Sequence, residues 1–393
     1  MSSFRLYPSA EQEIALLEHC AHARFVWNLG NEQRLMYRPG RRHTPGYVEQ
    51  CRQLTDARRA EPWLAAGSQT VQQQALRDLD QSWRYFFAGT HRRPGWRKQG
   101  RHEGFRIAGR RGEGSGCTWD VRRLNRRWGQ VQVPKVGWVR FRRSRNVPEC
   151  KSYRITRDRS GRWHVAFAVF PTPVDGPGAG EVVGIDRGVA VSLALSNGEM
   201  YQAPGSPSRV ERLARRLSRA KRGSNRRQRA KMRFARVKAI GADRRKDWAE
   251  KTSTDIARRF DVIRIEDLRI KNMTRSAKGT LEAPGRNVRQ KAALNRAILQ
   301  SGWGLFAERL EDKAPGRVEK VNPAYTSQRC SACGHIAAES RKSQALFVCV
   351  ACTYTGNADV NAARNIAAGH AVTARGGLGV TRPLNREPLA GAA

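Results

Sequence analysis

Two Cys-x-x-Cys pairs near the end of the chain constrain its fold more than any other feature. Cys330 and Cys333 form the first pair, Cys349 and Cys352 form the second, and 15 residues separate the two pairs. Each pair can supply two thiolates at the spacing of a metal-binding knuckle, and a hairpin between them would bring the pairs together. We therefore predict a zinc ribbon. Because four protein ligands leave no open coordination position, we expect this zinc to be structural.

The other cysteines show no such pattern. They are scattered along the chain, which in a reducing compartment indicates ordinary free thiols, at Cys20, Cys51, Cys117 and Cys150. His335 follows the first knuckle directly, and we expect it to be a neighbour of the metal rather than a ligand.

The charge of the chain predicts a polyanionic partner. Its 393 residues include 74 Lys and Arg but only 34 Asp and Glu, a formal net charge of +40 that is spread over the whole length. Neutralising phosphates releases condensed counterions, so nucleic acid is the expected partner, with a merely soluble surface as the alternative. Residues 201–250 carry 17 Lys or Arg and 4 acidic residues, which favours contact with a phosphate backbone over a solvated face.

No segment predicts a membrane protein. The longest apolar runs fall short of the about 18 residues needed to span a bilayer. The start of the chain, MSSFRLYPSAEQ, lacks the charged-then-apolar order of a signal peptide. We expect a cytoplasmic protein that has no membrane partner.

The first part of the chain alternates between helical and strand patterns. Ser9 and Gln12 form a potential capping box before a helix over residues 10–28, and a second amphipathic helix is predicted over 70–87. We assign the aromatic residues of the second helix to the core rather than to base stacking, because helical spacing is what packing produces. Short alternating segments follow, including a hairpin with its turn at residues 158–161. An N-terminal strand could pair into this β module, and the helical region would then be an insertion.

A Pro/Gly-rich linker at residues 172–181 begins the second part. Two apolar strands follow, with an Asn-Gly turn at 197–198, and then a polar helical stretch over 208–260. The remaining prediction is a strand ending near Glu266, a loop, one helix over 290–314, a strand over 316–323 and a disordered tail.

Three acidic residues occupy unusual positions. Asp186 ends an apolar strand, Glu266 ends another, and Asp359 opens a helix with only six residues between it and Cys352. Neighbouring strand ends meet at one edge of a sheet, so these carboxylates could meet around two divalent cations for phosphodiester hydrolysis. Taken singly, each acid also fits a helix cap or a surface ion pair. The order strand Asp, strand Glu, helix Asp favours the functional interpretation.

This order of motifs, with a zinc ribbon before the last acid, resembles the TnpB proteins of bacterial insertion sequences, compact relatives of type V CRISPR effectors. The resemblance covers about residues 1–370. It rests on the opening FRLYPSAEQ and ARFVWNLGNEQR and on the segments GIDRG, VIRIEDLRIKNM, SQRCSACGH, CVAC and NADVNAARNI.

The resemblance implies an RNA-guided DNA endonuclease, encoded by a transposable element, that cleaves guide-complementary DNA beside a short flanking motif. Guide pairing would supply sequence specificity. The implied cofactors are two catalytic Mg²⁺, one structural Zn²⁺ and a guide RNA derived from the transposon end, and the other partner is target double-stranded DNA. By position the Mg²⁺ ligands and catalytic residues are Asp186, Glu266 and Asp359, and the zinc ligands are Cys330, Cys333, Cys349 and Cys352. We expect a monomer associated with the bacterial nucleoid.

The resemblance also implies a multidomain α/β fold. An RNase H-like RuvC nuclease domain with an inserted zinc ribbon would follow a β-barrel wedge domain that carries a helical recognition insertion. The expected limits are 1–8 and 96–174 for the wedge, 9–95 for the helical recognition domain, 175–325 and 357–372 for the nuclease domain, 326–356 for the target-nucleic-acid-binding ribbon, and 373–393 for the disordered tail.

Two departures from the family pattern concern the ribbon and the helix after it. Thr353 stands where the family usually has Gly, so the second knuckle is expected to be less relaxed than the first, which Gly334 follows. Asn357 replaces an acid that many relatives carry, which leaves Asp359 as the ligand. Arg364 could face the scissile phosphate, although a surface role is the simpler interpretation.

Three alternatives remain. A nuclease-inactive RNA-guided repressor would be expected to have lost one of the three acids, and all three are present. A transposase could use similar acids on a similar fold. A zinc-ribbon RNA-binding protein without an active site would explain the charge and the cysteines, but it would leave the three acids as coincidence.

Overall fold

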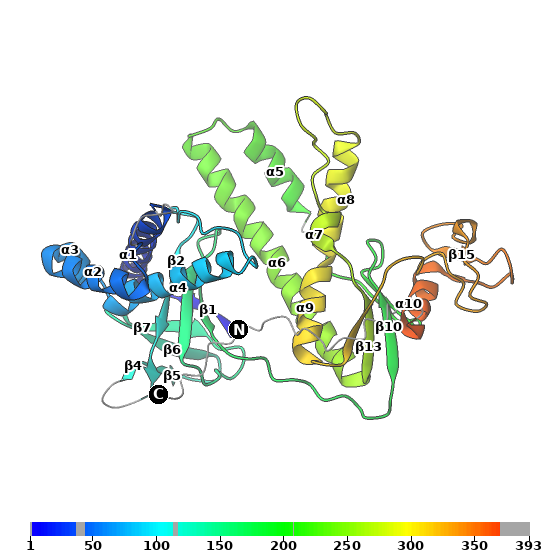
Figure 1. Ribbon diagram of the computed structural model, residues 1–393, viewed down its shortest axis with the longest axis horizontal. Coiled ribbons are helices and arrows are strands. Elements are labelled where there is room, and N and C mark those ends of the chain that lie inside the picture. Colours follow the sequence, from blue (N-terminus) through cyan, green and yellow to red (C-terminus); the bar gives the residue numbers. More distant parts are fainter. Residues whose placement is uncertain (1, 37–43, 113–116, 207, 370–393) are drawn as a thin grey trace. The chain divides into compact units, whose positions relative to one another are not determined.

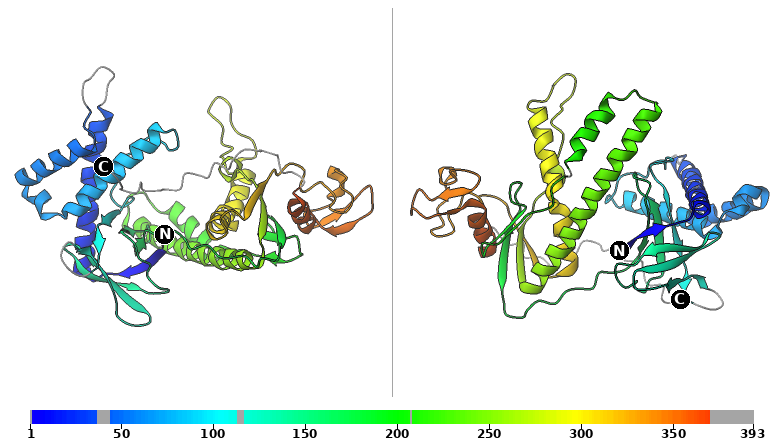
Figure 2. Two further views of the ribbon diagram at one scale, coloured as in Figure 1. Left: turned by 60° about the horizontal axis from the view of Figure 1, so that its bottom comes forward. Right: turned by 180° about the vertical axis from the view of Figure 1, so that it is seen from behind.

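The computed structural model describes residues 2–36, 44–112, 117–206 and 208–369, and it divides the chain into two compact units. The first unit comprises Met1–Pro171 and Pro207–Ile240, and the second comprises Thr172–Ser206 and Gly241–Ala393. Figures 1 and 2 show the elements of both. The predicted disordered tail, 373–393, lies outside the described residues. No helix within the described ranges is long and apolar enough to cross a membrane.

A seven-stranded sheet forms the centre of the first unit. Its strand order is β2-β8-β9-β1-β7-β6-β5, and all of its ladders are antiparallel. The strands are β1 (Ser2–Tyr7), β2 (Gly104–Ala108), β5 (Val121–Arg123), β6 (Trp128–Val133), β7 (Gly137–Arg142), β8 (Ser152–Arg157) and β9 (Trp163–Phe167). A separate short pair consists of β3 (Arg110–Arg111) and β4 (Cys117–Trp119).

The predicted pairing of the N-terminal strand is confirmed, because β1 lies between β7 and β9. The predicted hairpin is confirmed as β8 and β9, and its turn residue Gly161 has φ +83°. Buried and exposed residues alternate along the strands, as a half-buried sheet requires. Among the described strands, no ladder joins the edge strands β2 and β5, so closure into a barrel stays a prediction.

Helices cover the core of the first unit. They are α1 (Ala10–Leu35), α2 (Tyr47–Ala60), α3 (Pro62–Ala66) and α4 (Gln69–Phe87). The capping box of α1 is confirmed, since the Gln12 N–H donates to Ser9 Oγ and the Ser9 N–H donates to Gln12 Oε1. The core assignment of the α4 aromatics is wrong for Phe87, whose side chain is 75% exposed, because this last residue extends beyond the sheet-facing stripe.

The basic stretch over 208–260 forms two helices rather than one continuous element. These are α5 (Arg209–Arg219) and α6 (Asn225–Arg259), separated by a short turn in which Gly223 has φ +81°. The first helix ends before this glycine, where Ala220 adopts an extended conformation with φ −80° and ψ 134°. No residue of α5 is buried, whereas the second half of α6 places Ile256 and Ala257 in the core of the second unit.

A five-stranded mixed sheet organises the second unit, with the strand order β12-β11-β10-β13-β14. The strands β10 (Val182–Asp186), β13 (Val262–Glu266) and β14 (Val318–Val321) are parallel, and β11 (Leu193–Leu195) and β12 (Met200–Tyr201) continue the sheet in antiparallel pairing. The predicted Asn-Gly turn joins β11 to β12, where Gly198 has φ +95°.

The helix predicted over 290–314 is wrong as a single element. The chain forms α8 (Val288–Ser301) and α9 (Trp303–Lys313), because Gly302 adopts φ +73° between them. The preceding loop contains the short α7 (Ile270–Met273). After β14 come a short 3₁₀ turn (Ala338–Ser340), the hairpin of β15 (Leu346–Val348) and β16 (Thr355–Asn357), and finally α10 (Ala358–Ala368).

Candidate active site and zinc ribbon

Two of the three predicted acids lie at the same edge of the second sheet. The parallel strands β10 and β13 are hydrogen-bonded with Ile185 opposite Ile265. Asp186 and Glu266 each follow directly and end their strands. The sheet therefore brings together two carboxylates that are 80 positions apart in the sequence.

Close packing of α10 on β10 brings the third acid to this edge. A Cβ atom at Gly184 would lie 2.1 Å from the Ala363 carbonyl oxygen and 2.3 Å from the Ala367 nitrogen. Only glycine permits this approach, because any side chain would push the helix away. Asp359 lies one helical turn before Ala363, and a Cβ at Gly188, just beyond β10, would lie 3.9 Å from Asp359 Oδ2.

Asn357, not Asp359, caps α10. Its Oδ1 accepts the backbone N–H groups of Asp359 (2.9 Å) and Val360 (3.1 Å). The capping alternative for Asp359 is therefore wrong, because Asn357 already satisfies the first amides of the helix. The Asp359 carboxylate, which is buried, is therefore not used for capping and instead forms an ion pair with Arg341.

The three carboxylates influence one another electrostatically. Burial, followed by the charges of Glu266 and Asp359, raises the pKa of Asp186 to about 7. Burial also raises the pKa of Glu266 and of Asp359. Such a group of acids is costly to ionise without a compensating cation. Its hard oxygen donors are those that Mg²⁺ prefers, so the residues present suit a divalent metal.

Neighbouring side chains hold two of these acids. The Thr326 hydroxyl donates to Glu266 Oε1 at 2.7 Å, and an Arg341 guanidinium nitrogen lies 3.1 Å from Asp359 Oδ1. Arg187 is buried and donates to the Glu266 carbonyl oxygen, which ties the ends of β10 and β13 together. No pattern in the sequence marks these three residues.

The four cysteines are gathered more tightly than the carboxylates. Among the described His, Cys, Asp and Glu residues, they are the one group of three or more whose ligand atoms all lie within 4.8 Å of one another. The Sγ atoms of Cys330 and Cys352 are 3.7 Å apart, and those of Cys333 and Cys349 are 3.6 Å apart. A tetrahedral zinc with Zn–S bonds of about 2.3 Å requires sulfur separations of about 3.8 Å. The cluster therefore fits zinc.

The backbone of the second knuckle favours the thiolate form of Cys349. The N–H of Cys352, and after it that of Ala351, lowers the pKa of Cys349 to about 6. His335 is exposed and is not part of the cysteine cluster. A small core of Phe347, Cys330, Cys349 and Ala358 joins the ribbon to the start of α10.

The two knuckles differ as their sequences predict. Gly334 follows the first knuckle with φ +79°, and Thr353 follows the second with φ +57°. The left-handed conformation costs glycine nothing but strains a β-branched residue. The second knuckle is therefore the less relaxed one, although the Thr353 N–H still donates to the Cys349 carbonyl at 3.1 Å.

Two buried asparagines on α10 connect the helix to the first knuckle. Asn361 and Asn365 each donate to the Arg329 carbonyl oxygen at 2.7 Å, and Asn361 Oδ1 accepts the Ser331 N–H at 2.9 Å. Neither asparagine was predicted as a functional residue, although their four-residue spacing places them on one face of the predicted helix. Arg364, in contrast, is exposed and donates to the Tyr354 hydroxyl at 2.9 Å.

Three family models match the chain. A model described as "Cas12f1-like, TNB domain" matches residues 303–366, one described as "Probable transposase" matches 170–277, and one described as "Helix-turn-helix domain" matches 2–37. In residues 2–36 the structure has one strand and one long helix, β1 and α1, so the description of the third model does not fit the observed elements.

Full-length relatives and one solved structure agree with these matches. The chain is 36% identical to the "Putative RNA-guided DNA endonuclease InsQ" of Escherichia coli K12, over 98% of this chain and 96% of that protein. It is 30% identical to a "Putative RNA-guided DNA endonuclease" of Streptomyces pristinaespiralis, over 95% and 90%. The Cas12f1 chain of a complex with single guide RNA and target DNA superposes with a TM-score of 0.53 at 15% identity, over 91% of this chain and 83% of that one.

The fold and the site define a class of mixed α/β proteins that share the fold of Cas12f1. In this chain a four-cysteine cluster comes just before the last described helix, which packs on the sheet that carries the acidic residues. Within that class, the chain belongs to the TnpB family of insertion-sequence proteins.

Proposed function

We propose that the protein is an RNA-guided DNA endonuclease of an insertion sequence, cleaving guide-complementary DNA beside a short flanking motif. The observation that carries this proposal is the convergence of Asp186, Glu266 and Asp359 at one sheet edge, where burial and mutual repulsion raise the pKa of Asp186 to about 7. A fold gains nothing from burying three neighbouring acids unless a cation or a reaction uses them. The names of the two full-length relatives support the same activity.

In this proposal the three acids hold two Mg²⁺, which would supply an activated water and stabilise the leaving oxygen. Asp186 and Glu266 contribute from adjacent parallel strands, so the sheet fixes their spacing. Thr326 orients the Glu266 carboxylate, and Asn357 fixes the first turn of the helix that carries Asp359. The four cysteines hold one structural Zn²⁺.

We further propose the domain limits that the family resemblance implies. They are a wedge domain over 1–8 and 96–174, a helical recognition domain over 9–95, a RuvC-like nuclease domain over 175–325 and 357–372, and a target-binding ribbon over 326–356. The seven-stranded antiparallel sheet supports the wedge assignment. The parallel strands that end in Asp186 and Glu266 support the nuclease assignment. The partners are a guide RNA from the transposon end and target double-stranded DNA, bound by a monomer associated with the nucleoid.

The decisive experiment begins with the protein purified from cells that contain its native locus. The RNA that copurifies is sequenced. A plasmid that carries the matching site between randomised flanks is then incubated with the protein and Mg²⁺. We expect cleavage beside one short motif. Asp186→Ala should reduce the cleavage rate by about a thousandfold, because metal ions contribute several kcal/mol to such reactions, and should leave RNA binding intact. Asp247→Ala, which removes an exposed acid of α6, is the matched control.

Two results would favour the alternatives. Site-specific binding without cleavage would indicate a repressor. Strand-transfer products formed from purified protein and transposon ends would indicate a transposase. Equal cleavage by Asp186→Ala and the parent protein would overturn the assignment of the site.

A further inference from the structure

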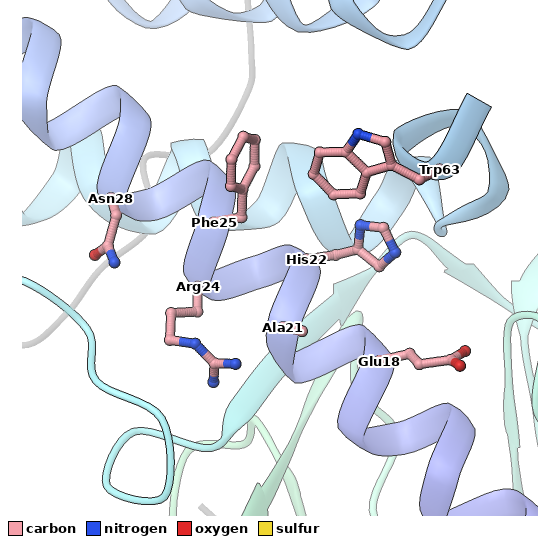
Figure 3. A pocket seen from close by; sticks show the side chains of 7 residues that line it. All are labelled: Glu18, Ala21, His22, Arg24, Phe25, Asn28 and Trp63. Carbon is pink, nitrogen blue, oxygen red and sulfur yellow. The ribbon is translucent and has the colours of Figure 1, made fainter. Parts of the chain in front are cut away.

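A second candidate binding site lies on the first unit, among aromatic side chains of α1 and α3. A cavity of about 440 Å³ is lined by Glu18, Ala21, His22, Arg24, Phe25, Asn28 and Trp63 (Figure 3). We call it the aromatic pocket. Its volume falls within the range of about 300–1,000 Å³ that is typical of ligand sites.

Helical spacing and a neighbouring helix create the pocket. Glu18, Ala21, His22 and Phe25 follow one another along one face of α1, and Trp63 reaches the same face from α3 (Figure 3). The Trp63 ring stacks on His22, with centroids 5.5 Å apart and planes at 16°. Phe25 meets Trp63 edge-on at 4.9 Å. The result is two fixed aromatic walls that meet nearly at a right angle.

Buried polar groups hold these walls in place. Gln72, which is fully buried, donates to the Leu64 carbonyl oxygen at 2.8 Å and lies 3.3 Å from His22 Nδ1. Arg58 donates to the carbonyl oxygens of Leu64 and Ala65, which fixes the short helix carrying Trp63. Such a preformed site binds a ligand without first having to order its own side chains.

The aromatic residues of the pocket are partly exposed to solvent and do not belong to the buried core of the first unit. Trp63 is 48% exposed and Phe25 is 42% exposed. Exposed aromatic residues that gather at a cavity indicate an interaction site, whereas single scattered ones do not. Burial has the largest effect on the pKa of His22 and lowers it. The Glu18 carboxylate partly opposes this effect and the charges of Arg58 and Lys135 reinforce it, so the neutral ring is favoured.

Charge complementarity indicates the kind of ligand. Arg24, which also pairs with Glu103 at 3.0 Å, lines the pocket, and the charges of Arg58 and Lys135 act on His22. The chain as a whole carries +40, so a polyanion is attracted to it. In the described part of the chain the exposed Glu18 carboxylate at its edge forms no hydrogen bond or ion pair, so it is free to accept N–H donors. A ligand that combines a polyanionic backbone, a flat ring and N–H donors is a nucleotide.

We propose that the aromatic pocket binds one unstacked base of a single-stranded RNA, and that Glu18 selects a base with adjacent N–H donors, guanine over uracil. The inference rests on the proposed function in that it assumes an RNA-bound protein. Guanine offers N1–H and N2–H to one carboxylate, whereas the carbonyls of uracil flank its single N–H and repel the carboxylate. RNA is favoured over DNA because its loops present unstacked bases, whereas a duplex base must first be extruded at a cost of a few kcal/mol.

The test uses the full-length, zinc-loaded protein freed of copurified RNA. Its affinity is measured by fluorescence anisotropy for oligouridylates of about twelve nucleotides that carry either guanine or uracil at the centre. The guanine oligonucleotide should bind about tenfold more tightly than the uracil one. Because backbone contacts are the same in both, the ratio of the two affinities isolates the contribution of the base.

Matched variants test whether the aromatic pocket causes this ratio of affinities. Glu18→Gln should reduce the preference for guanine to within about twofold. Trp63→Ala should weaken binding of the guanine oligonucleotide by about tenfold, as expected from loss of base stacking, and Trp63→Phe should restore most of it. Phe87→Ala removes an exposed aromatic of the same unit outside the pocket and should change neither value.

Three results would overturn the proposal. Equal effects of Trp63→Ala and Phe87→Ala would show that the pocket does not contact RNA. A loss confined to DNA oligonucleotides of the same sequences would assign the pocket to DNA. A dimer in solution that Trp63→Ala dissociates, with RNA affinity unchanged, would assign it to contact between copies. These results are independent of cleavage, so RNA binding with a normal guanine preference by a protein that cuts no DNA would count only against the proposed function.

Discussion

The zinc ribbon and the carboxylate site adjoin in the sequence only at Asp359, and they are built by different means. The four cysteines lie within residues 330–352, and their sulfur atoms are already within 4.8 Å of one another. The carboxylates come from two strands and a helix. Pairing of β10 with β13 brings Asp186 and Glu266 together, and close packing of α10 on β10 adds Asp359. A local ligand set depends on short-range chain geometry and on its metal. A dispersed set depends on the packing of the whole unit.

Removal of a zinc ligand should produce the largest effect, and it should be confined to the ribbon. Cys349→Ser breaks the tetrahedral set, and zinc binding on the order of 10 kcal/mol is what folds so small a segment. We expect loss of the bound zinc and rapid proteolysis within residues 326–356, with an unchanged first unit. Metal analysis and limited proteolysis measure both. Cys150→Ser, outside the cluster, is the control, and retention of a full equivalent of zinc by Cys349→Ser would contradict the assignment.

The carboxylate site should make the free energy of unfolding depend on pH. The pKa of Asp186 is about 7 in the folded protein, above its unfolded value, so the folded state binds the proton more tightly. Without Mg²⁺, this group therefore contributes stability at low pH that is lost as the pH rises towards 7, by about 1.4 kcal/mol for each pKa unit between the folded and unfolded states.

Asp186→Asn isolates this contribution. Between about pH 5.5 and about pH 8, the variant should lose less stability than the parent protein, and it should be the more stable of the two at the upper end. Urea titrations measure the free energy of unfolding, and Asp247→Asn serves as the control. Added Mg²⁺ should stabilise the parent protein more than Asp186→Asn at the upper end of this range. Identical pH profiles for the two proteins would be evidence against a strained carboxylate group.

Gly184→Ala tests whether tertiary packing assembles the dispersed site. The new Cβ would lie 2.1 Å from the Ala363 carbonyl oxygen, so α10 must shift, at a cost of about 1–3 kcal/mol. We expect lower cleavage activity and weaker Mg²⁺ binding, whereas the zinc content remains unchanged. Gly205→Ala has open space around its Cβ and is the matched control. If Gly184→Ala retained full activity, the close contact would have no functional importance.

The smallest effect should come from Thr353→Gly. Glycine adopts the observed φ of +57° freely, so the second knuckle should be stabilised by about 1 kcal/mol. Thr353→Ala keeps a Cβ in the left-handed conformation and should gain less. Slower release of zinc to a chelator measures the gain. Faster release from Thr353→Gly than from the parent protein would mean that the threonine hydroxyl bond to the Cys352 carbonyl outweighs the strain.

Local patterns predicted most individual elements. The capping box, the β8–β9 hairpin and the Asn-Gly turn are short-range features, and the structure contains all of them. The helical stretch predicted over 208–260 is divided where Ala220 becomes extended, and the single helix predicted over 290–314 is divided at Gly302. Isolated glycines inside a helical pattern signal a break only weakly, because whether one forms depends on what packs against the flanking turns.

The candidate site also has one part that local sequence predicts and another that only the fold decides. The residue types and the spacing of the cysteines determined the zinc ribbon, and the positions of the three acids at the ends of apolar segments indicated which carboxylates to consider. The roles of Thr326, Asn361 and Asn365 follow only from tertiary contacts, as does the capping of α10 by Asn357 in place of Asp359. A sequence can specify local geometry, because neighbours along the chain are bound to meet. Only the packed fold decides which distant residues share an edge, since that depends on which helix can approach which strand.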